Sequence, residues 1–263
     1  MDSASFLEKI VAEKKKKIAA RRLFLENIRR NTETAELSYY GLFKSRLQGQ
    51  DGIRLIAEIK RASPSQGVIR EEFGVSQLAR IYRESGAAAL SVLTEQTFFL
   101  GRPDYIRLAA EFGLPVLAKD FFIDPLQIYE VYSYGAKAIL LIAAVLTDEQ
   151  INVFRGIARR LDMDCLVEVH TQQELDRVLN CGVDMIGVNN RDLRTFEIDF
   201  DAGERLLRQI PKECVRVIES GIRSHDDVLR FQDAGAQAVL IGETFMRAAD
   251  VGARVKEIMG ELS

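Results

Sequence analysis

The sequence has no tryptophan and is poor in histidine and cysteine, with two and three respectively among 263 residues. Cys165, Cys181 and Cys214 lack CxxC spacing, and an odd number of cysteines makes a disulfide framework unexpected. His170 and His225 share no ligand spacing with each other or with the cysteines, so we predict no metal site. Each histidine precedes a predicted helix, where we expect a capping or surface role.

Long hydrophobic runs and an excess of positive charge are also missing. No apolar stretch approaches the roughly 20 residues that a membrane-spanning helix needs. The N-terminal stretch MDSASFLEKIVAEKKKK lacks the apolar core of a signal peptide. The formal net charge of -3 gives no general attraction for nucleic-acid backbones. These absences predict a cytoplasmic protein that binds neither nucleic acid nor a membrane.

Two N-terminal segments carry apolar residues at approximately helical spacing. We predict helices over residues 3–30 and 34–48. The basic run Lys14 to Lys17 lies inside the first segment, and we interpret it as a solvated helix face rather than a site for an anionic partner. Residues 1–50 should form a helical extension that packs on the rest of the chain.

From residue 53 onward, short apolar runs alternate with stretches long enough for a helix. The runs cover residues 53–59, 87–93, 114–118, 136–142, 164–169, 183–188, 214–218 and 236–241. ESGAAALSVL, SYGAKAILLI, NCGVDMIGVN and DAGAQAVLIG each end a helix in Gly and then enter a strand. Continuous apolar strands separated by helices predict a parallel sheet covered on both faces.

Eight such units predict a (β/α)8 TIM barrel, an α/β fold, with residues 1–50 as its N-terminal helical extension. We expect residues 1–263 to form a single domain. An open doubly wound sheet should carry a Gly-rich dinucleotide fingerprint after its first strand, and this sequence has KRASPSQG there.

Four of the helix starts carry capping signals. Asp124-Pro125 places a proline at a first helical position. Thr147 to Gln150 has the capping-box pattern, Thr171 to Glu174 repeats it, and Ser224 to Asp227 is a weaker variant.

Polar residues gather where the predicted strands end. Catalytic groups of a barrel of this kind lie at the C-terminal ends of its strands. Charged or amide residues stand there on five of the eight: Glu58, Lys60, Lys119, Glu168, Asn189, Arg191 and Glu219. A single Lys at a strand end is usually a surface residue, but the repetition at one end favours an active site. Opposite charges would make their burial tolerable.

The last two predicted strands are followed by ESGI at residues 219–222 and IGE at residues 241–243. Barrels frequently bind phosphate in these two loops, and Gly221 and Gly242 would let backbone N–H groups approach an anion closely. We therefore predict a small phosphorylated substrate. Lys119 could form an imine or transfer a proton, and the residue pattern leaves both open.

Long segments spread over residues 53–247 resemble the indole-3-glycerol-phosphate synthase family. They are AEIKRASPSQGVIR, LSVLTEQTFFLG, LPVLAKDFFIDPLQI, CLVEVHTQQEL, IGVNNRDLRTFEID, ESGI and VLIGETFMR. An N-terminal helical extension is also a feature of that family. The sequence departs from the family pattern at Gln66, Ala118 and Ile218, none of which removes a polar residue expected in the site.

The resemblance implies a carboxy-lyase of tryptophan biosynthesis. It would convert 1-(2-carboxyphenylamino)-1-deoxyribulose 5-phosphate into indole-3-glycerol phosphate, with loss of carbon dioxide and water and without a metal or organic cofactor. Lys119 matches the acid that protonates the ketone oxygen during ring closure, and Glu168 matches a proton-transferring carboxylate. Lys60 and Glu58 match paired groups on the first strand. The second acid could be Lys60 or Glu168.

The resemblance also implies where the substrate would bind. Asn189, Arg191, Glu219 and Ser220 match residues around its hydroxyls and carboxylate, and we count Asn189 and Ser220 with the catalytic group. The phosphate would rest on Gly221, Gly242 and Glu243, with Lys60 or Ser63 close by. Phe98, Phe121 and Leu193 would flank the aromatic ring.

Two other functions are compatible with a phosphate-binding barrel. The isomerase that makes this substrate typically has a Cys at the end of its first strand, where this sequence has Glu58 and Lys60. An inactive barrel serving as a regulator would be expected to lack Lys119, Glu168 or the ESGI segment, and all are present. The resemblance also permits an association with other enzymes of the tryptophan pathway.

Overall fold

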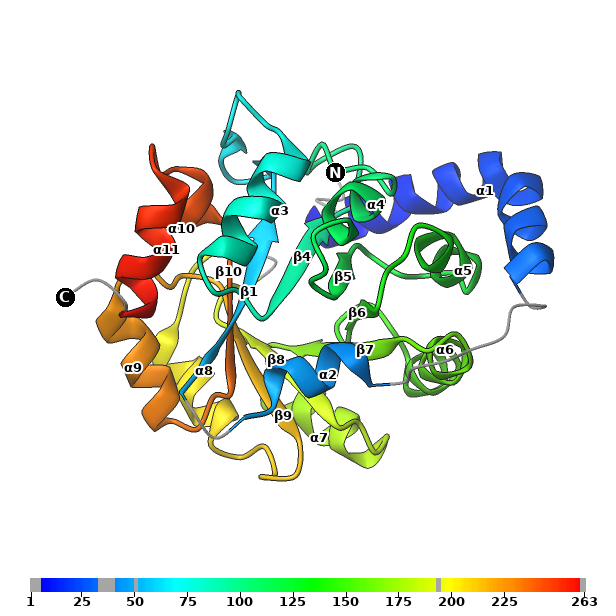
Figure 1. Cartoon of the computed structure of the whole chain (residues 1–263). Coiled ribbons are helices and arrows are strands. Elements are labelled where there is room, and N and C mark those ends of the chain that lie inside the picture. The colour runs from blue at the N-terminus through cyan, green and yellow to red at the C-terminus, as the bar shows by residue number, and fades with distance from the viewer. Residues whose placement is uncertain (1–5, 33–40, 50–51, 193–194, 261–263) are drawn as a thin grey trace.

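Eight parallel strands close into a barrel that is surrounded by helices (Figure 1). This computed structural model describes residues 6–32, 41–49, 52–192 and 195–260. The barrel strands are β1 (Arg54–Ile59), β4 (Ala89–Leu93), β5 (Val116–Lys119), β6 (Ala138–Ile142), β7 (Asp164–Val169), β8 (Met185–Asn189), β9 (Val215–Glu219) and β10 (Ala238–Ile241). Neighbours follow chain order, and β10 pairs with β1 to close the ring. The predicted (β/α)8 barrel is confirmed.

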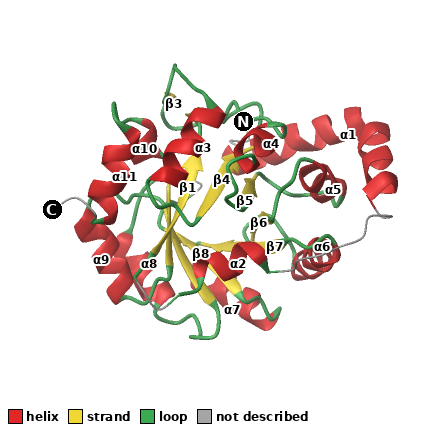
Figure 2. Cartoon of the chain, viewed as in Figure 1, coloured by secondary structure: helices red, strands yellow, loops and turns green. Residues whose placement is uncertain are grey.

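The helices that follow the strands form the outer layer, drawn red around the yellow barrel in Figure 2. They are α3 (Val75–Glu84), α4 (Tyr105–Ala110), α5 (Leu126–Ser133), α6 (Asp148–Arg160), α7 (Gln172–Asn180), α8 (Phe200–Leu207), α9 (His225–Asp233), α10 (Glu243–Met246) and α11 (Val251–Met259). Buried side chains of these helices and of the outward-facing strand positions form the larger hydrophobic core. None of the helices in the described ranges is long and apolar enough to cross a membrane.

Five of the predicted strands begin two residues before the observed ones. The cause is the turn that ends the preceding helix. After Gly235, which has φ +98°, the N–H of Ala236 donates back to the carbonyl of Phe231 at 2.9 Å. Equivalent bonds hold Ala87, Ala136 and Val183. The first apolar residues after each glycine therefore close the helix, and the strand starts later.

A short hairpin after β1 was not predicted from the sequence. It pairs β2 (Ala62–Ser63) with β3 (Gly67–Val68) in antiparallel register. Each strand has only two residues, which is too short to give a periodic pattern. The hairpin holds Ser63 beside the mouth of the barrel.

The long first helix, α1 (Phe6–Thr32), agrees with the predicted helix over 3–30, whose first residues lie outside the described ranges. It runs beside α5 (Figure 1). One face is buried through Ile10, Lys14, Ile18 and Leu25. The interpretation of the basic run as solvated is wrong for Lys14, because its spacing of four from Ile10 and Ile18 puts it on the buried face. Lys15 and Lys16 are exposed as expected.

The second part of the extension closes the end of the barrel at which the strands begin. Within the predicted helix over 34–48, the structure describes α2 (Leu42–Leu47), and residues 33–40 lie outside the described ranges. Phe43 and Leu47 are fully buried against the interior of the barrel. The backbone N–H of Lys44 donates to Asp164 at the start of β7, at 2.9 Å. Helix α2 therefore seals the N-terminal ends of the strands.

The capping predictions are largely confirmed. Thr147 and Gln150 form a reciprocal capping box at α6, and Ser224 forms one at α9 although its partner is Asp227. Thr171 accepts a hydrogen bond from the N–H of Glu174 at 3.2 Å, and the Glu174 carboxylate accepts the N–H of His170 at 2.7 Å.

At α5, the proline lies one position earlier than predicted. Pro125 is the N-cap and the helix begins at Leu126. Asp124 accepts a hydrogen bond from the N–H of Leu126 at 2.9 Å, which satisfies one of the free donors of the first turn.

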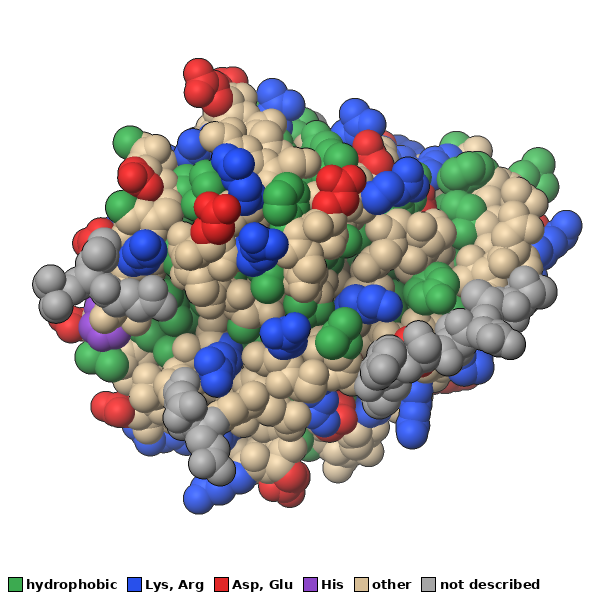
Figure 3. Space-filling view, in the orientation of Figure 1, with side chains coloured by type: hydrophobic (Ala, Val, Ile, Leu, Met, Phe, Trp, Pro, Cys, Tyr) green, Lys and Arg blue, Asp and Glu red, His purple; other side chains and the backbone are tan. Residues whose placement is uncertain are grey.

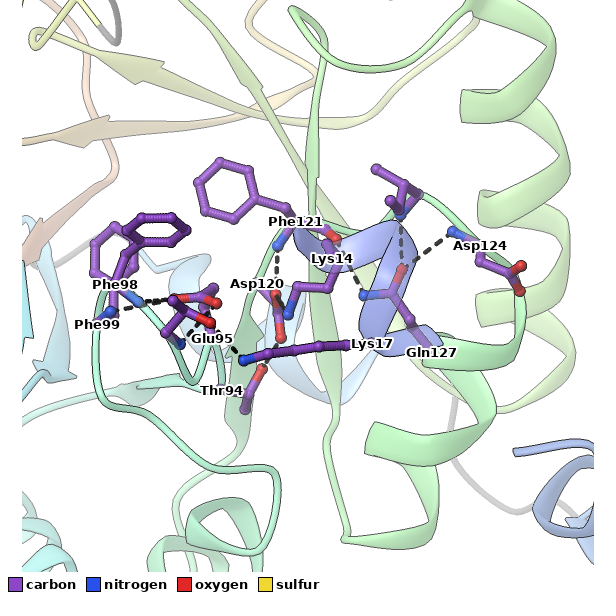
Figure 4. A network of polar contacts seen from close by, with 12 residues as sticks. Lys14, Lys17, Thr94, Glu95, Phe98, Phe99, Asp120, Phe121, Asp124 and Gln127 are labelled. Carbon is purple, nitrogen blue, oxygen red and sulfur yellow. Dashed lines mark hydrogen bonds and ion pairs between the residues drawn. The ribbon is translucent and has the colours of Figure 1, made fainter. Parts of the chain in front are cut away.

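The buried ion pair of Lys14 with Asp120 fixes α1 to the end of β5 (Figure 4). The two atoms that pair lie 2.6 Å apart, with side chains 9% and 8% exposed. Removing one partner of a buried pair typically costs about 3–5 kcal/mol, because the other charge stays buried. Asp120 keeps hydrogen bonds from Thr94 and the N–H of Phe121. We therefore expect Lys14→Met to lower the free energy of unfolding by about 3 kcal/mol.

Urea unfolding followed by circular dichroism measures this change. Lys15→Met is the matched control, since Lys15 belongs to the same basic run and is exposed. Its free energy of unfolding should stay close to that of the parent. Equal stability of the two variants would contradict the structural role of Lys14.

Candidate active site

A cavity of about 530 Å³ opens at the C-terminal ends of the barrel strands. Its wall is formed by strand ends, the loops after them and the first turns of α1. Most of the residues predicted for the site line it: Glu58, Lys60, Ser63, Lys119, Phe121, Glu168, Asn189, Arg191, Ser220, Gly221, Gly242 and Glu243. The barrel therefore brings together residues from the loops or ends of six strands.

Two predicted residues are placed differently, and a third cannot be placed. Glu219 lies beneath the wall, where it is 1% exposed and bound to Lys119. Phe98 packs edge-on against Phe6, with ring centroids 5.1 Å apart, and Phe99 lines the cavity instead. Leu193 lies outside the described residues.

Lys119 at the end of β5 stands between two carboxylates. Its Nζ lies 2.5 Å from Glu219 Oε2 and 3.6 Å from Glu168 Oε2. Burial alone would lower the pKa of Lys119, but the charges of Glu219, Glu168 and Glu58 outweigh it and raise the pKa above its ordinary value. Lys119 is therefore a protonated ammonium, which can donate a proton but lacks the free electron pair that forms an imine.

Glu219 at the end of β9 is a buried carboxyl group whose neutral form is favoured by burial. Burial raises its pKa, Lys119 opposes this, and the nearby charge of Glu168 adds to the rise, so that the pKa of Glu219 reaches about 7. Gly187 on β8 leaves the space for this carboxylate, because a Cβ there would lie 2.3 Å from Glu219 Oε1. Glu219 is thus a buried group whose charge can change near neutral pH.

Glu58 and Lys60 of the first strand form an ion pair 2.7 Å long. Burial would raise the pKa of Glu58, but Lys60, Lys119 and Arg191 together hold it below its ordinary value. A Cβ at position 242 would lie 2.2 Å from Glu58 Oε2. Glycine at this position is therefore required by the protein itself, whether or not an anion binds.

The far end of the cavity, near the loops after β9 and β10, carries positive charge. Arg223, Arg247 and Arg254 line it and were not predicted, because they lie on or beside helices rather than at strand ends. The Ser63 hydroxyl is buried there without a hydrogen-bond partner within the described structure. Gly221 has φ +87°, and a Cβ on it would lie 2.6 Å from the Phe200 ring.

The opposite wall is apolar. Phe6, Leu7 and Ile10 of α1 line it together with Phe99 and Phe121. The three residues of α1 were recognised only as part of an amphipathic helix, since the sequence alone does not show which part of the barrel the helix covers. The extension therefore contributes directly to the site.

Asp120, next to Lys119, was also not recognised as important. Figure 4 shows it at the centre of a network from α1 and from the loops after β4 and β5. Asp120 pairs with Lys14 and accepts a hydrogen bond from Thr94 at 2.6 Å. Glu95, which follows Thr94 in the chain, accepts hydrogen bonds from the N–H groups of Thr97, Phe98 and Phe99. This network fixes the backbone from which Lys119 projects.

His170 does not have the predicted capping or surface role. Its side chain is 11% exposed and lies between Glu168 and Glu174. The residue follows β7 directly, and the two-residue spacing from Glu168 puts both side chains on one side of the chain. His225 begins α9, half-buried, with Nδ1 3.0 Å from the carbonyl of Ile258.

No group of three or more His, Cys, Asp or Glu residues in the described parts of the chain is arranged to hold a metal ion. The carboxylates of the site are paired with ammonium groups instead. The metal-free chemistry predicted from the sequence stays a prediction.

Comparison with known proteins decides the family. A family model described as indole-3-glycerol phosphate synthase matches residues 7–258. The chain belongs to this family. A synthase of this name from Acetivibrio thermocellus is 45% identical over 258 residues, covering 95% of this chain and 98% of the relative. One from Albidiferax ferrireducens is 47% identical, covering 96% and 97%.

Solved structures with the same fold are more distant. A KGPDC from Streptococcus mutans superposes with a TM-score of 0.61 at 12% identity, covering 80% of this chain and 97% of that one. This likeness concerns the barrel alone. The family assignment rests on the matches to indole-3-glycerol phosphate synthases.

The raised pKa of Glu219 makes the stability of this family member depend on pH. Since its folded-state pKa of about 7 exceeds its ordinary value of 4.5, Glu219 gains a proton on folding between these values. The stability linked to that proton is present below the lower value and is lost as the pH rises through the upper one. Glu219→Gln keeps the neutral form at every pH. The free energy of unfolding of Glu219→Gln minus that of the parent should therefore increase between about pH 5 and about pH 8. The increase should be about 1.4 kcal/mol for each unit by which folding raises the pKa of Glu219 in the parent.

Urea unfolding at the two pH values measures this difference. Glu58→Gln is the matched control, because the pKa of Glu58 is lowered and its carboxylate stays ionised over this range. That variant should be destabilised by a similar amount at both pH values. A difference between Glu219→Gln and the parent that does not change with pH would refute the pKa argument.

Proposed function

We propose that the cavity closes the indole ring of 1-(2-carboxyphenylamino)-1-deoxyribulose 5-phosphate, with Lys119 as the proton donor. As a member of this family the protein is a decarboxylating lyase of tryptophan biosynthesis. The observation that carries the proposal is the position of Lys119 on the cavity wall, where its Nζ lies between the carboxylates of Glu219 and Glu168. A volume of about 530 Å³ lies within the range of small-molecule sites.

Ring closure needs an acid. As the aryl carbon attacks the ketone carbon, negative charge develops on the ketone oxygen, and a proton delivered there lowers the barrier. Lys119 suits this step because the carboxylates keep it charged until the substrate oxygen can accept its proton. Glu219 and Asp120 would position it, one through the ammonium group and the other through the backbone.

Dehydration needs a second acid and a base. After carbon dioxide has left, the hydroxyl departs with a proton and the ring carbon loses one, which restores the aromatic indole. We assign the base to Glu168, which lies within 3.6 Å of Lys119 and can exchange protons with it. We assign the acid to Lys60, whose Nζ lies on the cavity wall 2.7 Å from Glu58 Oε2. Asn189 and Ser220 lie on the wall where they can bind the hydroxyls.

The two ends of the cavity suit the two ends of the substrate. The apolar wall from α1, with Phe99 and Phe121, would hold the aromatic ring. The phosphate would bind at the opposite end, near Ser63, Gly221 and Gly242, where three arginines supply positive charge. Arg191 and Glu243, whose charged atoms lie 3.5 Å apart, would border the carboxylate and the phosphate.

We further infer that the protein works in the cytoplasm, where its three free cysteines would stay reduced. Acidic and basic side chains alternate on the face seen in Figure 3, and no broad patch of one sign covers it. An association with other enzymes of the pathway rests on the family resemblance.

Lys119→Met tests the proton donor. The variant keeps most of the apolar stem and removes the proton, so turnover should fall by at least about 10²-fold. The rate is followed through the fluorescence of the indole product, which stands out because the protein contains no tryptophan. Lys15→Met, at an exposed position, should turn over at the parent rate. A folded Lys119→Met protein with near-parent turnover would refute the assignment.

Ser63→Ala tests the phosphate end. Inorganic phosphate should raise the melting temperature of the parent, because a ligand that binds the folded state stabilises it by mass action. Loss of the Ser63 hydroxyl should reduce that rise, since this buried group is free to bind phosphate. Gly221 is unsuitable for the test, because any side chain there would strain the backbone and meet Phe200.

Ser91→Ala is the matched control. The Ser91 hydroxyl is also buried without a hydrogen-bond partner in the described structure, but it does not line the cavity. This variant should keep the full response to phosphate. Equal responses of the two serine variants would place the phosphate elsewhere.

A further inference from the structure

His170 is a buried titratable group that the proposed steps do not use. Both ring nitrogens are buried, and neither makes a well-formed hydrogen bond to another described group. The nearest charged atoms are carboxylate oxygens on either side of the ring. Nε2 lies 3.4 Å from Glu168 Oε1, and Nδ1 lies 3.5 Å from Glu174 Oε2. The imidazole therefore bridges the proposed base and a carboxylate of α7.

The two carboxylates have fixed positions. Glu174 is in the first turn of α7, and its Oε2 accepts the backbone N–H of His170 at 2.7 Å. Thr171 caps the same turn through the N–H of Glu174. Glu168 is 2% exposed, and its Oε2 lies 3.6 Å from Lys119 while its Oε1 faces His170. Each oxygen of Glu168 thus has one neighbour that can carry positive charge.

The surroundings favour a charged imidazole. Glu168 of β7, Glu174 of α7 and Glu219 of β9 face His170, and Lys119 of β5 lies beyond Glu168. Burial opposes the charge, but the nearby carboxylates of Glu174, Glu168 and Glu219 outweigh it and raise the pKa of His170. The single ammonium group of Lys119 pairs with both Glu168 and Glu219. His170 supplies Glu168 with a positive neighbour of its own.

We propose that His170 is a positioning residue, held by Glu174, that orients the Glu168 carboxylate towards Lys119, where Glu168 can accept a proton. His170 is not among the residues that line the cavity, so it acts through Glu168 and not on the substrate. The proposal rests on the assignment of Glu168 as the base. It adds a link from the start of α7 to the reacting groups.

The first test measures the charge of His170 without any turnover. The chain has two histidines, so proton NMR gives two imidazole signals, and His225→Gln assigns them. In the parent, we expect His170 to titrate above the ordinary value of about 6.5. Glu174→Gln should lower its pKa, because an opposite charge close to the ring is lost. Titration at or below the ordinary value, or no change in Glu174→Gln, would overturn the proposal.

The second test measures turnover. His170→Gln cannot carry the charge, and kcat should fall roughly 10-fold, since small displacements of a reacting group can slow a reaction by up to about 10²-fold. KM should stay unchanged because the side chain does not reach the cavity. The ratio of parent to variant kcat should decrease as the pH rises through the His170 pKa, because the parent then loses the same charge.

The outcomes separate the two proposals. His225→Gln is the matched control and should keep the parent kcat. A purely structural role of His170 would lower stability and leave the kcat ratio independent of pH, which would overturn the positioning role. If Glu168→Gln turned over like the parent, the assignment of the base would fail, whereas the NMR titration would still decide whether His170 is a charged neighbour of Glu168.

Discussion

The burial of one charged ammonium group, that of Lys119, is the constraint on which the rest of the site depends. An isolated ammonium in the interior would lose its proton or destabilise the fold. Two carboxylates on neighbouring parts of the barrel, Glu168 and Glu219, keep it charged. Their own charges must then be balanced, and the raised pKa of Glu219 and the cationic neighbour His170 of Glu168 do this. The proposed proton donor, the proposed proton acceptor and a carboxyl group of raised pKa are thus linked through one largely enclosed charge.

The packed barrel accommodates these groups because glycines lie behind two of the carboxylates. Gly187 leaves room for Glu219, and Gly242 leaves room for Glu58. An alanine at either position would place its Cβ within 2.3 Å of a carboxylate oxygen. In the sequence, Gly187 has no evident purpose, and Gly242 is interpreted only as a glycine that lets the backbone approach a phosphate. Their function is visible only when the side chain of the adjacent strand is in place.

The fold was predictable from the sequence because it rests on local patterns. Eight apolar runs separated by helices ending in Gly define the barrel, and the errors at strand starts come from the turns around residues such as Gly235. The charged residues at the strand ends were predicted because the fold puts all strand ends on one side, whereas Arg223, Arg247 and Arg254 lie on or beside helices and were not. Lys14, Asp120 and His170 were missed or misread, since their importance depends on contacts between distant segments. The spacing of Lys14 from Ile10 and Ile18 places it on the buried face of α1, but only the contact with Asp120 shows why a lysine stands there.

The N-terminal extension shows how contacts between distant segments complete the site. At one end of the barrel, Phe43 and Leu47 of α2 fill the space between the strands, so this end is closed to water. At the other end, the first turns of α1 form a wall of the cavity, and the pair of Lys14 with Asp120 attaches that helix next to Lys119. Exclusion of water strengthens the electrostatic interactions inside a site. The helix that forms this wall is therefore anchored on Asp120, the residue next to the proposed proton donor, so that the position of the extension and the position of Lys119 depend on the same contact.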